Sequence, residues 1–220
     1  MRTACLEELT PMPDATPTVY VVDDDPDVLK AIERLLESSG LNVAIFASPQ
    51  RFLEAYERDA PGCLVLDLAL PGLNGLDVQR VLEQQSSVLP IVFLTGRGDI
   101  GASVQAMKHG AADFLTKPVD DTALLAAVHE ALARDKVLRP AQLERERIAK
   151  LIAALTERER QVLEGIVSGK LNKQIATELG TTEKTIKFHR GNLMRKLDVR
   201  VVADLVKLAE RAGIGSKPRS

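Results

Sequence analysis

One stretch, CLVLDLALPGLNG at positions 63–75, places the strongest constraint on the fold. Its apolar residues Leu64–Leu66 have the composition of a buried strand, and they lead directly to a lone carboxylate, Asp67. The Pro, Gly and Asn residues at 71–75 then predict a loop. Because parallel α/β sheets bind ligands at the carboxyl ends of their strands, Asp67 is predicted to be a reactive carboxylate.

The same succession of a buried strand and an amphipathic helix repeats through the first part of the chain. Strands are predicted at 18–22, 43–47, 64–67, 91–95 and 113–115. Helices are predicted at 26–39, 48–56, 76–85, 102–109 and 120–133. Five strands alternating with five helices predict an α/β fold with a doubly wound, five-stranded parallel sheet.

Charge and pattern both divide the chain into two parts. Residues 1–139 carry 12 Lys and Arg against 21 Asp and Glu, whereas residues 140–220 carry 17 against 10. The apolar pattern is lost between Ala133 and Arg139, and Pro140 is predicted to interrupt the chain there. A net charge of −9 followed by +7 favours a second part that binds an anion such as nucleic acid. A solvated basic surface without a partner is the alternative.

The sequence gives no indication of a membrane segment. No apolar run has the length that spans a bilayer, and the N-terminal residues lack the apolar region of a signal peptide. We therefore expect a cytoplasmic protein with no membrane partner. Cys5 and Cys63 support neither a disulfide framework nor a metal site.

Polar residues end four of the predicted strands: Asp23 with Asp24, then Asp67, Thr95 and Lys117. A parallel sheet gathers these ends at one edge, where three carboxylates repel one another unless a hard cation, for which we expect Mg²⁺, binds them. An ammonium and a hydroxyl suit phosphoryl oxygens. The set predicts a carboxylate that accepts a phosphoryl group beside Mg²⁺.

Each of these residues also has a plain structural interpretation. The acids at 23–25 precede Pro26 and could cap the first helix. Thr95 could be a turn residue, and Lys117 part of a loop. The joint placement at successive strand ends favours the phosphoryl site.

Residues 18–134 resemble the receiver domain of bacterial response regulators through VVDDDPDV, LVLDLALPGLNG, IVFLTGRGDI and AADFLTKPVD. The resemblance implies that Asp67 is phosphorylated by a sensor histidine kinase and that Asp23 and Asp24 are the acidic pair at the metal. It also implies Asp24, Asp67 and the Ala69 carbonyl as Mg²⁺ ligands, with Thr95 as switch hydroxyl, Phe114 as switch aromatic and Lys117 as phosphate-pairing lysine. Haloacid-dehalogenase-type phosphatases also phosphorylate an Asp, but they need an acid where this chain has Ala69.

The second part is predicted to be helical throughout. An amphipathic helix with Leu143 and Leu155 on its apolar stripe leads to Thr156 and Glu159, which have capping-box spacing. Further helices are predicted to begin at Asn172, near Thr182 and at 201. The second and third, joined by a short Gly-containing turn, predict a helix-turn-helix. A short coiled coil in the linker is an open alternative.

The third of these helices is predicted to have an apolar face and a basic face. Ile186, Leu193 and Leu197 share the inner face. The outer face fits the major groove of DNA, with flanking residues on phosphates. The predicted DNA-binding residues are Lys173, Lys184, Thr185, Lys187, Phe188, Arg190, Gly191, Asn192 and Arg195, and Lys170 and Lys196 are expected to flank them.

Residues 156–212 resemble the four-helix DNA-binding domain of the LuxR/NarL/FixJ group through LTERERQVL, GKLNKQIATELG and TEKTIKFHRGNLMRKL. The resemblance implies a transcription regulator, not an enzyme, that dimerises on phosphorylation and binds promoter DNA, with RNA polymerase as a further partner. A signalling adaptor whose second part binds protein is the alternative.

These interpretations divide the chain into five segments. We expect a tail over 1–17, a receiver domain over 18–134, a linker helix over 135–155, a small all-α helix-turn-helix domain over 156–213 and a tail over 214–220.

Overall fold

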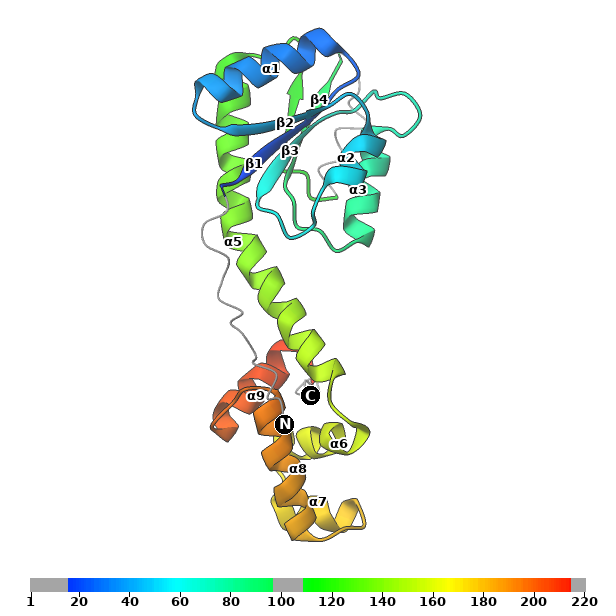
Figure 1. Cartoon of the computed structure of the whole chain (residues 1–220), viewed down its shortest axis with the longest axis vertical. Coiled ribbons are helices and arrows are strands. Elements are labelled where there is room, and N and C mark those ends of the chain that lie inside the picture. The colour runs from blue at the N-terminus through cyan, green and yellow to red at the C-terminus, as the bar shows by residue number, and fades with distance from the viewer. Residues whose placement is uncertain (1–15, 97–108, 215–220) are drawn as a thin grey trace, which may run out of the picture. The chain divides into compact units, whose positions relative to one another are not determined.

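The computed structural model describes residues 16–96 and 109–214. The chain divides between Pro140 and Ala141 into two compact units (Figure 1). Each unit has buried hydrophobic clusters of its own.

The first unit is built on a parallel sheet of five strands. These are β1 (Thr18–Val22), β2 (Asn42–Phe46), β3 (Gly62–Asp67), β4 (Ile91–Thr95) and β5 (Asp113–Thr116), in the order β2-β1-β3-β4-β5. Val22 is paired with Leu66, and Leu66 with Phe93, so β1, β3 and β4 end close to one level. The strand order reverses at β1, and in sheets of this kind ligands bind at the carboxyl edge beside such a reversal. The predicted doubly wound fold is confirmed.

Helices cover both faces of this sheet (Figure 1). Helices α1 (Pro26–Ser38) and α5 (Asp121–Ala153) pack on one face, and α2 (Pro49–Ala55) and α3 (Gly75–Gln84) pack on the other. Successive residues of β1 serve opposite cores: Val21 packs with α1 and α5, whereas Val22 packs with α2 and α3. The helix predicted at 102–109 lies outside the described residues except for His109, which is in a turn.

Helix α5 is longer than predicted. We expected a helix to end at Ala133 and a separate one to follow Pro140, but α5 runs without interruption from Asp121 to Ala153. The predicted break is wrong. Pro140 has no N–H to donate to the preceding turn, which costs a helix about 3 kcal/mol. Burial on both sides of Pro140 offsets that cost, with Ala131 in the core of the first unit and Ile148 in the core of the second.

A buried ion pair fixes α5 just before Pro140. The Arg139 guanidinium donates to both carboxylate oxygens of Asp135, at 2.6 and 3.0 Å. Asp135 also accepts a hydrogen bond from the Gly62 N–H at 3.1 Å, and Arg139 donates to the Arg58 carbonyl at 2.9 Å. The side chains of the pair are 3% and 7% exposed. Together these bonds tie this part of α5 to the beginning of β3.

The second unit is a helical bundle. The end of α5 packs with α6 (Glu157–Val167), α7 (Asn172–Glu178), α8 (Glu183–Lys196) and α9 (Val202–Arg211). A short turn with Gly180 at φ +60° joins α7 to α8. The core contains Leu163, Ile175 and Leu193, one from each of three successive helices. The predicted all-α helix-turn-helix arrangement is confirmed.

The predicted capping box begins α6 and also connects α6 to α8. The Thr156 hydroxyl accepts from the Glu159 N–H at 3.3 Å, and the Glu159 carboxylate accepts from the Thr156 N–H at 2.8 Å. The ammonium of Lys196, in α8, donates to the same carboxylate at 2.7 Å. Burial alone would raise the pKa of Glu159, but the bonds from Lys196 and Thr156 outweigh it and lower that pKa below its usual value.

We predict that Asp135→Ala destabilises the first unit by about 3–5 kcal/mol, because it leaves a buried guanidinium without its carboxylate. The chain's tyrosines, Tyr20 and Tyr56, both lie in the first unit, and it has no Trp, so tyrosine fluorescence during urea unfolding follows that unit. Arg80→Ala is the matched control, since it breaks a surface ion pair with Asp77 in the same unit and should cost at most about 1 kcal/mol. Equal losses of unfolding free energy in both variants would contradict a stabilising role for the buried Asp135–Arg139 pair.

We predict that Glu159→Gln destabilises the second unit by about 1–2 kcal/mol at neutral pH, through loss of a charged cap and its bond to Lys196. A carboxyl whose folded-state pKa is lowered stabilises the fold above its ordinary pKa of 4.5, and that stability is lost as the pH falls through the folded-state value. Unfolding followed by far-ultraviolet circular dichroism should therefore show the deficit shrinking in acid. Glu157→Gln is the control, and a deficit independent of pH would argue against this role.

Candidate functional site

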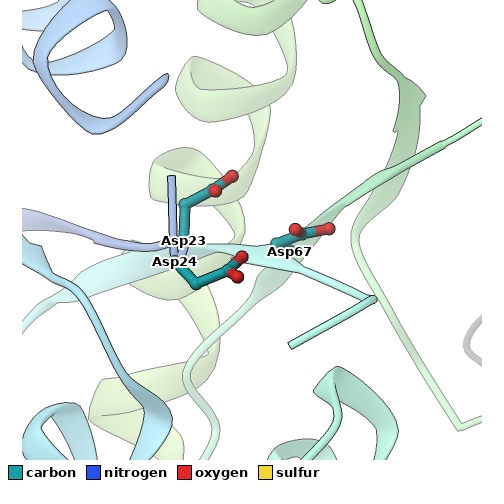
Figure 2. Close-up of side chains that lie close together, drawn as sticks. All are labelled: Asp23, Asp24 and Asp67. Carbon is teal, nitrogen blue, oxygen red and sulfur yellow. The ribbon is translucent and has the colours of Figure 1, made fainter. Parts of the chain in front are cut away.

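Three carboxylates meet at the carboxyl edge of the sheet (Figure 2). Asp23 and Asp24 follow β1, and Asp67 ends the neighbouring strand β3. Each offers an oxygen within 4.8 Å of the oxygens of the other two. Asp23 and Asp67 are buried, at 0% and 5% exposure, whereas Asp24 is exposed. The arrangement is a set of hard oxygen donors that suits a divalent cation.

The capping interpretation applies to a different acid in the same run. Asp25 is the N-cap of α1, and its carboxylate accepts the Asp27 N–H at 2.8 Å. Asp23 accepts the Asp25 N–H at 2.9 Å through one carboxylate oxygen, and its other oxygen accepts from Lys117. Asp23 and Asp24 therefore belong to the acidic cluster, and Asp25 belongs to the helix.

Lys117 brings a positive charge to the cluster from the end of β5. Its ammonium donates to Asp23 at 2.5 Å and to Asp67 at 2.9 Å. Burial raises the pKa of Asp23, although the bond from Lys117 acts against that rise. Burial alone would lower the pKa of Lys117, but its bonds to the two carboxylates outweigh it and raise that pKa. Lys117 is therefore held as a cation between two carboxylates.

Thr95 and Phe114 come from the neighbouring strands β4 and β5. The Thr95 side chain is buried, and its hydroxyl donates to the Gly96 carbonyl at 3.1 Å. Phe114 is half-buried, with its ring centroid 6.1 Å from that of Phe93 on the α2 and α3 side of the sheet. The backbone N–H of Lys117 donates to the Thr95 carbonyl at 2.6 Å, which joins the ends of β4 and β5.

The loop after β3 packs closely on the end of that strand. The Ala69 N–H donates to the Asp67 carboxylate at 3.2 Å, while the Ala69 side chain is exposed. A Cβ on Gly75 would lie 2.8 Å from the Asp67 carbonyl oxygen and 3.1 Å from the Phe93 ring. Gly75 therefore lets α3 begin directly against the strand that carries Asp67.

The predicted DNA-binding residues lie on α7 and α8 of the second unit. Phe188 is 64% exposed, whereas Ile186 and Leu193 on the opposite side of α8 are buried. Among the others, Lys173, Lys184, Lys187, Gly191 and Arg195 are exposed, and Thr185, Arg190 and Asn192 are half-buried.

Several of the basic side chains near this surface have partners within the unit. Lys187 lies 3.3 Å from Glu183, and Arg190 donates to the Asn172 side chain at 3.3 Å. Lys170 pairs with Glu178 at 2.7 Å. Lys196, which we expected to bind phosphate, donates to the buried carboxylate of Glu159 and so stabilises the packing of α8 on α6. This role depends on a contact between distant segments, which the helical pattern of α8 does not indicate.

Two family models match the chain, one in each unit. Residues 19–129 match the response regulator receiver domain, and residues 153–209 match the LuxR family of bacterial regulatory proteins. In the described ranges, 16–96 and 109–214, no helix has both the length and the apolar character needed to cross a membrane.

Similar proteins share both parts of the chain. Nodulation protein W of Bradyrhizobium diazoefficiens is 43% identical over 198 residues, which cover 90% of this chain and 87% of that protein. The response regulator protein TodT of Pseudomonas putida is 42% identical over 210 residues, which cover 94% of this chain and 91% of TodT.

Solved structures agree with these matches. The response regulator StyR is 45% identical with a TM-score of 0.74, covering 90% of this chain and 100% of that one. Full-length FixJ from B. japonicum is 37% identical with a TM-score of 0.53, and the match covers 90% of this chain and 98% of FixJ. The chain therefore belongs to the two-component response regulators that join a receiver domain to a LuxR-type DNA-binding domain, a family of transcription regulators.

Proposed function

We propose that Asp67 accepts a phosphoryl group from a sensor histidine kinase and that this phosphorylation controls DNA binding. The observation that carries the proposal is the Lys117 ammonium 2.9 Å from the Asp67 carboxylate, at a sheet edge that also holds Asp23 and Asp24. A partly buried cation beside an acceptor carboxylate favours the approach of an anionic phosphoryl group.

In the proposed transfer, a carboxylate oxygen of Asp67 attacks the phosphorus of a phosphohistidine. A P–O bond forms, the P–N bond breaks, and the imidazole leaves with a proton. A carboxylate is itself a nucleophile, so this step needs no general base. The Lys117 ammonium, with three N–H donors, would keep one bond to an acid and give another to a phosphoryl oxygen.

Asp23, Asp24 and Asp67 would hold Mg²⁺, with the Ala69 carbonyl as a further ligand. The carboxylates of the three Asp residues each offer an oxygen within 4.8 Å of the others, and carboxylate oxygens are ligands that Mg²⁺ prefers. These residues therefore fit the ion. When bound, Mg²⁺ supplies positive charge to the phosphoryl oxygens. The exposed position of Asp24 leaves this side of the cluster open to water, which Mg²⁺ retains as a ligand.

Thr95 and Phe114 would form the switch. The Thr95 hydroxyl would leave the Gly96 carbonyl for the phosphoryl group, and the half-buried Phe114 ring would turn further inward. Phosphorylation adds about −1.5 to −2 charges at Asp67, next to Lys117. Shifting a two-state population from 1:99 to 99:1 takes about 5.5 kcal/mol, which new charge-assisted bonds to Lys117 and Thr95 would help to supply.

The second unit would bind promoter DNA through α8, whose N-terminal residues Lys184, Thr185 and Lys187 would lie nearest the base edges. Two copies that dimerise on phosphorylation would place two such helices on a two-fold operator. RNA polymerase in the cytoplasm is the proposed partner at the promoter. Within this scheme residues 18–134 form the phosphoacceptor domain, 135–155 the connection, 156–213 the DNA-binding domain, and 1–17 and 214–220 the tails.

We predict that Asp67→Asn abolishes phosphoryl labelling by the kinase or by a small acyl phosphate, because an amide is not a phosphoryl acceptor. Asp59→Asn, which changes an exposed loop acid of the same unit, is the control and should label normally. Labelling that persists in Asp67→Asn, with unchanged circular dichroism, would refute the acceptor assignment.

Asp24→Asn tests the metal site separately from the acceptor. With Asp67 intact, labelling should slow by at least about tenfold and should need more Mg²⁺ to reach half its maximal rate. A rate and a Mg²⁺ requirement equal to those of the unchanged protein would exclude Asp24 as a ligand.

We predict that Lys187→Ala weakens binding to duplex DNA and lowers the slope of log affinity against log salt by about one. Fluorescence anisotropy of the full chain over a salt series measures both quantities. Lys207→Ala, an exposed lysine on α9, is the matched control and should leave the slope unchanged. Affinity that does not depend on salt would count against the groove model and favour a protein-binding adaptor.

A further inference from the structure

Phe188 has no role in the core of the second unit. Its side chain is 64% exposed in the middle of α8, and its ring lies 5.8 Å from the ring of the next residue, His189, at 67°. The hydrophobic core of this unit does not include it. The Phe188 ring therefore contributes little to the stability of the unit through burial.

Gly191, one turn further along the same face, is not required by the fold either. A Cβ there would meet nothing within 4 Å, and its φ lies outside the left-handed region. Glycine is disfavoured inside helices, so this position gives up stability without any packing reason. Residues three apart share a helix face, so Phe188 and Gly191 together form an apolar spot that offers no side-chain hydrogen bond.

The charges around this spot indicate what covers it. Lys184, Lys187 and Arg195 lie on the same exposed face. A second copy of this face would bring like charges together, whereas DNA brings phosphates to them. The occupant is therefore a base edge in the major groove, a conclusion that rests on the DNA-binding function proposed above.

The chemistry of the major groove selects the base. G, A and C present donors and acceptors there, and these would lose their bonds to water against an apolar ring. Thymine also presents its C5-methyl group, the apolar group among the four edges. We infer that Phe188 contacts the C5-methyl group of a thymine and that Gly191 lets this base edge approach the backbone of α8. Phe188 is thus a specificity-determining residue.

The test removes single thymine methyl groups from the bound DNA. Duplexes that the full chain enriches from a random-sequence pool, in the presence of acyl phosphate and Mg²⁺, serve as probes. Each thymine is changed in turn to deoxyuridine, which removes the methyl group and keeps the base pair. The unchanged protein should lose about three- to tenfold in affinity at one thymine in each half-site. Phe188→Ala should bind more weakly overall and bind thymine and deoxyuridine alike.

Two controls separate this inference from general DNA binding. Val201→Ala removes methyl groups from another exposed apolar residue and should keep the preference for thymine. At the sensitive position, 5-methylcytosine should bind better than cytosine, and Phe188→Ala should remove that difference as well. Salt-dependent binding of Phe188→Ala with the thymine preference intact would overturn the inference and leave the proposed function standing. If the unchanged protein binds no duplex in a salt-dependent manner, both fail.

Discussion

The Lys117 ammonium between the carboxylates of Asp23 and Asp67 is the interaction on which the phosphoryl site depends. It joins the ends of β1, β3 and β5, since Lys117 is 94 residues from Asp23 and 50 residues from Asp67 in the chain. Without a cation, three neighbouring carboxylates would repel one another and push the strand ends apart. With Lys117 in place, the cluster is compact, and its net negative charge still favours a metal ion. The same contacts place the ammonium where a phosphoryl group on Asp67 would need it.

The long helix α5 shows how local and tertiary effects compete. Proline opposes helix formation in its own turn, yet α5 has residues buried in the core of the first unit up to Ala131 and in the core of the second unit from Ile148. The Asp135–Arg139 pair also fixes the helical turn before Pro140, because Asp135 bonds to β3 and Arg139 bonds to the loop that precedes β3. Because β3 begins at this clamp and ends at Asp67, one strand connects the anchor of α5 with the reactive carboxylate.

Helix α8 divides its residues between folding and binding. Ile186 and Leu193 serve the core, and Lys196 serves the fold through Glu159. Phe188 and Gly191 contribute nothing to the packing of the unit, and both would be poor choices for stability alone. Residues that weaken a fold without structural need are the places where function is expected.

The sequence by itself determined the strands and helices that have a local signal: apolar runs ending in acids, the helix start at Asn172, the cap at Thr182 and the capping box at Thr156. It also determined that Asp23, Asp24, Asp67, Thr95 and Lys117 share one edge, since parallel strands end on the same side. Only the tertiary structure decided that α5 passes through Pro140 and that Lys117 contacts both Asp23 and Asp67. These outcomes depend on burial and on contacts between distant segments, and no local pattern of residues records which distant groups will meet.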